Sequence, residues 1–92
     1  LGQSVRSTTI AAGAGATAVA GPAKLKAIWI VAAGTAGSLV LEDATGGTER
    51  LDLDTPAAIG GHYIELPDGG IDFTTEIFAT LTTATFATLF YR

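Results

Sequence analysis

Residues 23–55 constrain the fold of this 92-residue chain more than any other stretch, because they predict three consecutive β-strands. Side chains of alternating character are typical of strands, and runs that contain glycine mark the turns between them. The turns lie at Gly34–Gly37 and Ala44–Gly47, and the predicted strands cover residues 23–33, 38–44 and 48–55. We expect a hairpin at each turn, so that the three strands form a meander.

The first of these strands has two apolar faces. Ile28 and Ile30 share a face with Lys26 and Ala32, and the opposite face carries Leu25, Ala27, Trp29 and Val31. A strand that is apolar on both sides favours a central position, covered by a second sheet on one side and by a loop or another subunit on the other. By contrast, the strand at residues 48–55 alternates Leu51 and Leu53 with charged residues, which predicts one solvated face. Pro56 is expected to end it.

The rest of the chain adds further short strands. We expect strands at residues 5–10, 16–20, 62–66, 71–74, 76–82 and 85–92, with the last two joined as a hairpin at Thr83-Ala84. In this hairpin Ile77, Ala79, Leu81, Ala87, Leu89 and Tyr91 face away from Phe78, Phe86 and Phe90. About eight strands without a convincing helix predict an all-β fold, a small antiparallel β-sandwich of the jelly-roll type with two four-stranded sheets. An immunoglobulin-like sandwich is the alternative, although its usual cysteine and tryptophan anchors are missing.

Two parts of the chain differ in composition. Residues 1–21 are rich in small residues and predict an N-terminal arm with a possible edge strand, which would reach neighbouring subunits and order on assembly. Residues 22–92 predict a single sandwich domain. A domain of this length has a marginal core, and no cysteine is present to cross-link it. Because 48% of the residues are apolar and only 15% are charged, we expect self-association.

Charge and hydropathy exclude several classes of partner. The net charge of −4, with five basic residues scattered among nine acidic ones, argues against nucleic acid. No apolar run approaches the roughly 20 residues of a membrane helix, and the first ten residues do not resemble a signal peptide.

No motif indicates catalysis or a cofactor. His62 has no second histidine or cysteine to share a metal ion, and we interpret it as structural. Asp52 and Asp54, with Glu49 or Asp43, have the oxygen ligands that a hard cation prefers, but they are more typical of a solvated strand face. The serines, Ser4, Ser7 and Ser38, lack a histidine partner in sequence, and the glycine-rich runs do not open helices. We therefore expect a non-enzymatic protein without cofactor or metal.

The aromatic residues are too many for one thin core. We predict that Ile28, Ile30, Phe78, Phe86 and Phe90 belong to an interface in which the hairpin at residues 77–91 and the strand at residues 25–32 contact other copies. A homotrimer is the expected assembly.

Two stretches carry a resemblance to a known family. They are GPAKLKAIWIVAAGTAGSLVLEDATGGTERLDLDTPA and IELPDGGIDFTTEIFATLTTATFATLFY, which together span about residues 20–92. Their order of strand, G-x-x-G turn, strand, D-x-x-G-G turn, strand, P-x-G-G-I-x-F turn and final ATLT and FY segments resembles small β proteins of tailed bacteriophages, especially marine and cyanobacterial phages. These motifs are turn and strand patterns.

The resemblance implies a structural component of the virion. Its leading form is a jelly-roll decoration (cement) protein that binds the major capsid protein and stabilises the head exterior. The alternative within the virion is a tail, fibre or vertex component. A third hypothesis, from another class and not implied by the resemblance, is a stand-alone carbohydrate-binding sandwich that displays aromatic rings.

Overall fold

The chain forms two antiparallel β-sheets packed face to face. The structure is a computed structural model that describes residues 5–32, 34–55 and 59–92. Its strands are β1 (Arg6–Ala11), β2 (Ala16–Ala20), β3 (Ala23–Ala32), β4 (Gly37–Glu42), β5 (Glu49–Thr55), β6 (Gly60–Glu65), β7 (Ile71–Phe73), β8 (Glu76–Thr82) and β9 (Ala84–Tyr91). Within these ranges there is no helix. The prediction of an all-β sandwich is confirmed.

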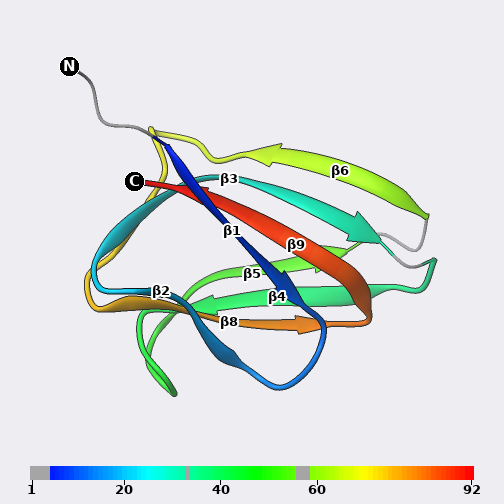
Figure 1. Cartoon of the computed structure of the whole chain (residues 1–92), viewed down its shortest axis with the longest axis horizontal. Coiled ribbons are helices and arrows are strands. Elements are labelled where there is room, and N and C mark those ends of the chain that lie inside the picture. Colours follow the sequence, from blue (N-terminus) through cyan, green and yellow to red (C-terminus); the bar gives the residue numbers. More distant parts are fainter. Residues whose placement is uncertain (1–4, 33, 56–58) are drawn as a thin grey trace.

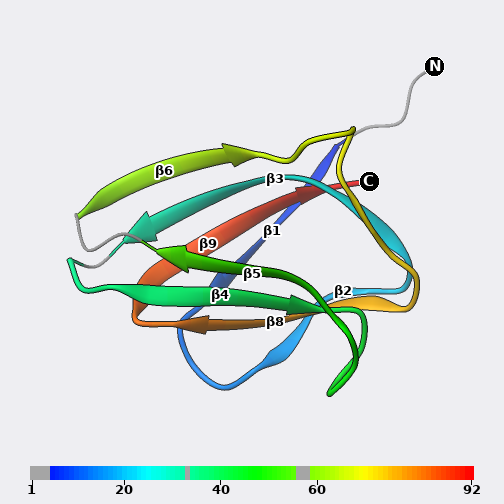
Figure 2. The ribbon, with the colours of Figure 1, turned by 180° about the vertical axis from the view of Figure 1, so that it is seen from behind.

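The order of the strands is that of a jelly roll. Sheet A has the order β1-β9-β3-β6, with β7 pairing β3 beyond the end of β6, and sheet B has the order β2-β8-β4-β5. Figures 1 and 2 show the two sheets as separate layers. The first strand thus pairs with the last, the second with the next to last, and β4 with β5 at the centre of the sequence. This nesting matches a jelly roll. It rules out the immunoglobulin-like alternative, in which the first two strands lie in one sheet.

Two predicted hairpins are wrong, because the chain changes sheets at both places. β3 belongs to sheet A and β4 to sheet B, so the turn at Gly34–Gly37 crosses between layers; only the β4–β5 hairpin of the expected meander is confirmed. β8 and β9 also lie in different sheets, and Thr83 alone separates them at a corner with a φ of 61°. Crossing lets the apolar faces of successive strands pack against each other across the sandwich, whereas a flat hairpin would leave both faces on one side.

The predicted faces of β8 and β9 are confirmed. Ile77 and Leu81 from sheet B and Ala87 and Leu89 from sheet A are buried in one core, and Phe73 of β7 joins them. The largest fully buried side chains are Phe73, Leu25, Ile28, Ile30, Leu39, Leu41, Ile77, Leu81 and Leu89. Each contributes about 1.5–3 kcal/mol relative to an exposed position, so this core dominates the stability of the fold.

The N-terminal segment belongs to the sandwich. β1 pairs with β9 along its whole length and is the edge of sheet A, as predicted, while β2 has the predicted bounds and is an edge of sheet B. Ile10 and Val19 reach the core. The interpretation of residues 1–21 as a separate arm is therefore wrong for residues 6–20, because both strands pair with the last two strands of the chain. Residues 1–4, Ala33 and Pro56, which also figured in the predictions, lie outside the described residues.

Candidate functional site

Two of the five predicted interface residues lie in the core. Ile28 is 0% exposed and Ile30 is 1% exposed, and both contact the buried cluster between the sheets. A shift in the β3–β9 register between Leu25 and Ala27 is the reason, because it puts Leu25, Ile28 and Ile30 on the same side of the sheet. The expected strict alternation of β3 is wrong at this bulge. Neither isoleucine is available to a second copy.

The three predicted phenylalanines lie on opposite faces of the molecule. Phe78 is on the outer side of sheet B, where the loop at Gly15 covers it so closely that a Cβ on Gly15 would lie 2.6 Å from its ring. Phe86 and Phe90 alternate with the buried Ala87 and Leu89 and therefore lie on the outer side of sheet A. The predicted single patch is thus wrong for Phe78.

The outer side of sheet A carries most of the exposed aromatic surface of the described chain. The register places Trp29 of β3 between Thr88 of β9 and Tyr63 of β6, and Val31 next to Phe86. Trp29 is 39% exposed and Tyr63 is 60% exposed. We call this surface, made by Trp29, Val31, Tyr63, Phe86 and Phe90, the aromatic face. An apolar surface of this kind is typical of a binding site.

Gly61 allows Trp29 to pack closely against the neighbouring strand. A Cβ at Gly61 would approach the Trp29 ring to 2.1 Å, so any larger residue would displace the indole. The glycine in edge strand β6 therefore leaves room for the exposed tryptophan to pack against that strand.

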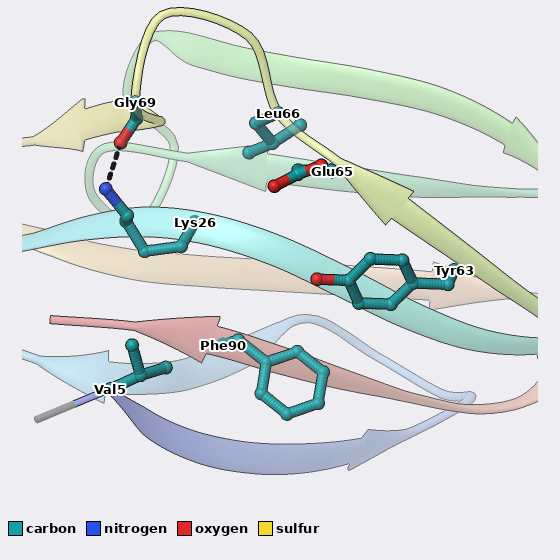
Figure 3. A pocket seen from close by; sticks show the side chains of 7 residues that line it. All are labelled: Val5, Lys26, Tyr63, Glu65, Leu66, Gly69 and Phe90. Atoms are coloured by element: carbon teal, nitrogen blue, oxygen red, sulfur yellow. Dashed lines mark hydrogen bonds between the residues drawn. The ribbon is translucent and has the colours of Figure 1, made fainter.

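A groove opens at one end of the aromatic face. It has a volume of about 390 Å³ and is lined by Val5, Lys26, Tyr63, Glu65, Leu66, Gly69 and Phe90. Figure 3 shows Val5 and Phe90 on one side, Leu66 and Glu65 on the other, and the hydroxyl end of Tyr63 pointing toward the middle. The rings of Tyr63 and Phe90 are 6.4 Å apart, centroid to centroid, and tilted by 58°. The volume lies within the ~300–1,000 Å³ usual for small-ligand sites.

The polar groups of the groove come from β3, from β6 and from the β6–β7 turn. Lys26 donates from Nζ to the Gly69 carbonyl at 2.5 Å, and Leu66 N–H donates to the Lys26 carbonyl at 3.2 Å. The Glu65 carboxylate makes no hydrogen bond or ion pair with the described part of the chain. The sequence had indicated the turn at Pro67–Gly70 but not these groove residues. The only sequence signal for these groove residues was that Tyr63 and Glu65 alternate with Ile64 along a predicted strand and therefore share one face.

The acidic residues on sheet B do not form a cation site. Asp43 accepts hydrogen bonds from the Thr74 amide and hydroxyl, both at 2.7 Å, and from the Thr75 amide at 3.2 Å, and it lies 3.5 Å from Arg50. Asp52 and Asp54 are exposed on β5. Among the described residues, no group of three or more acidic, histidine or cysteine side chains is arranged to hold a metal ion.

These contacts give Asp43 a structural role. The Thr74 hydroxyl lowers the pKa of Asp43 below its ordinary value of 3.8, with help from the Thr74 and Thr75 amides and the Arg50 guanidinium, against the opposing effect of desolvation. The charged carboxylate thus ties the loop after β4 to the segment before β8.

His62 lies on the inner side of β6, opposite Ile30. Its Nε2 is buried without a hydrogen-bond partner in the described structure. Ser7 pairs with Phe90 on the outer side of sheet A, and Ser38 pairs with Asp54 and Thr82 on the outer side of sheet B, so neither serine shares a surface with this imidazole. Ser4 lies outside the described residues.

The fold and the site together define a small jelly-roll domain with an aromatic outer sheet face. No family model, curated protein or solved structure matches the chain. No helix in the described ranges is long and apolar enough to cross a membrane.

Proposed function

We propose that this chain is a non-enzymatic structural protein of a phage virion, a decoration protein that binds the major capsid protein on the head exterior as a homotrimer. The resemblance of residues 20–92 to small phage β proteins suggests the setting. The aromatic face supplies the physical argument, since a contact between subunits can bury it.

The end of this face around Trp29, Val31 and Phe86 is the proposed contact between copies. Aromatic side chains are enriched at the centre of protein interfaces, where they exclude water over a large area. The single observation that carries the proposal is the 39% exposure of Trp29, a large apolar side chain whose ring packs closely against Gly61 of the neighbouring strand. A side chain that is already packed on one side loses less conformational entropy when a partner covers the other.

Retention on phage capsids tests this function. Expanded capsids stripped of decoration proteins should bind the chain stoichiometrically and tolerate higher temperature when it is bound. A trimer presents three capsid contacts at once, so losing the contact between copies should weaken retention by a factor of about 100 or more. We therefore expect Trp29→Ala and Phe86→Ser to be released from capsids during sedimentation, whereas wild type is retained.

Asp52→Asn is the matched control. Asp52 is exposed on the outer side of sheet B, away from the aromatic face, so its variant should be retained as wild type is. Failure of the wild-type chain to sediment with any expanded phage capsid would contradict the proposal. Equal retention of wild type, Trp29→Ala and Phe86→Ser would remove the aromatic face from it.

A further inference from the structure

We infer that the groove beside Tyr63 and Phe90 is a binding site for a neutral saccharide. The inference goes beyond the proposed role in the virion and does not depend on it. Tyr63, which pairs with Trp29, forms the border between the groove and the proposed contact, and the other groove residues lie on the side of Tyr63 away from Val31 and Phe86. A contact between copies around Trp29, Val31 and Phe86 therefore leaves the interior of the groove open.

The shape of the aromatic wall favours a sugar over a flat ligand. Because Tyr63 and Phe90 are tilted by 58° to each other, a planar heterocycle can stack on one ring but not on both. A pyranose presents C–H groups in several directions and can contact both rings. Val5 and Leu66 add aliphatic surface on the two sides of the groove (Figure 3).

The polar groups are suited to hydroxyls. The Tyr63 phenol can donate a hydrogen bond to a ligand and accept one from it. The Glu65 carboxylate can accept two or more hydrogen bonds from a ligand, because no described residue donates a hydrogen bond to it. Ligand sites of this size usually combine an apolar lining with a few such convergent polar groups.

The charges of the groove point to a ligand without net charge. Lys26 and Glu65 are its two charged residues, one of each sign. An anionic ligand would meet the Glu65 carboxylate, and a cationic ligand would meet the Lys26 ammonium group. A ligand that carries hydroxyls and no net charge encounters neither repulsion.

The groove is also held in shape before any ligand binds. The β6–β7 turn is closed by the hydrogen bond from Gly70 N–H to the Pro67 carbonyl at 3.0 Å, and Lys26 fixes the Gly69 carbonyl. Walls that are already ordered reduce the entropy cost of binding.

Saturation-transfer NMR and calorimetry on the full chain, with neutral oligosaccharides of glucose, galactose and N-acetylglucosamine as probes, test the site. We expect at least one probe to bind saturably and to perturb the Tyr63 and Phe90 ring signals. Tyr63→Ala should weaken binding about tenfold or more through loss of the ring, and Glu65→Gln should weaken it by a smaller factor. Tyr63 is 60% exposed, so its replacement leaves the core intact, which the NMR spectrum checks directly.

Asp52→Asn, on the other sheet, is the control and should bind as wild type does. Absence of saturable binding by every neutral probe overturns the inference, as does binding that Tyr63→Ala leaves unchanged. Preference for sialylated or sulfated glycans would contradict the charge argument. If the Val5 and Leu66 signals of the groove shift with protein concentration in the absence of sugar, the groove belongs to a contact between copies and the inference is wrong.

Discussion

At the scale of single residues, the pH dependence of stability should depend on Asp43. Hydrogen bonds led by that of Thr74 lower its pKa in the folded state, so the charged carboxylate stabilises the fold above its unfolded value of 3.8. This contribution should be lost as the pH falls from about 5 through the lowered folded pKa. Asp43→Asn should therefore reduce the urea midpoint at neutral pH and flatten its fall in acid.

The comparison with Asp52→Asn isolates this effect. Asp52 makes no contact with Asp43, Thr74 or Thr75 in the described structure, so replacing it should leave the hydrogen bonds of Asp43, and the acid dependence that they cause, unchanged. Parallel curves of urea midpoint against pH for wild type and Asp43→Asn would show that the Thr74 contact does not depend on charge.

At the scale of secondary structure, β1 is expected to be necessary for a stable fold. Its six residues pair with β9, from Arg6 opposite Tyr91 to Ala11 opposite Phe86, and Ile10 packs on the core. Deleting residues 1–11 should lower the free energy of unfolding by about 3 kcal/mol or more, since several ladder hydrogen bonds are lost. It would also expose β9 as a new edge, which favours aggregation.

Urea denaturation and light scattering measure the two consequences of this deletion. A variant that lacks only residues 1–4 keeps the whole of β1 and should match wild type in both measurements. A truncated chain from residue 12 that stays monomeric and unfolds at the wild-type midpoint would restore the interpretation of this segment as a detachable arm.

At the scale of the whole molecule, the many apolar residues lie in two regions, the core between the sheets and the outer side of sheet A. Most aliphatic side chains fill the core between the sheets, and much of the aromatic content, including Trp29 and Tyr63, lies on the outer side of sheet A. We therefore expect light scattering after gel filtration to give three times the 9.3 kDa of one chain. Phe86→Ser should shift the mass toward one chain, because burying an aromatic anchor often contributes about 2 kcal/mol to an interface. A wild-type chain that stays monomeric at millimolar concentration would contradict the trimer.

The predictions from sequence were right where only local alternation mattered. Leu51 and Leu53 point toward the core from β5, and Phe86 and Phe90 alternate with buried Ala87 and Leu89 as expected. They were wrong where a local irregularity decides the outcome. The bulge near Leu25 moved Ile28 and Ile30 into the core, and no residue type in AKLKAIWI marks it.

For the groove, too, local features were predictable from sequence and the contacts between distant residues were not. The Pro67–Gly70 turn and the strand before it were predictable, because their residues carry the preference for a turn and for alternation. Their position beside Val5, Lys26 and Phe90 was not, because those residues come from the start, the middle and the end of the chain. Only the pairing of β3 with β6 and β9 brings them together.

The amino-acid pattern was enough to predict that this protein is built of short strands, where most of them begin and end, and which side of each regular strand is apolar, since all three depend on neighbours along the chain. It was not enough to predict which strands pair, that Thr83 and the Gly34–Gly37 turn cross between sheets, or which aromatic residues remain outside, since these depend on contacts between distant parts of the chain. An apolar strand face has the same sequence pattern whether it packs between the two sheets or lies exposed on the outer side of one of them. Only the packing of the two sheets against each other determines which of these positions it takes.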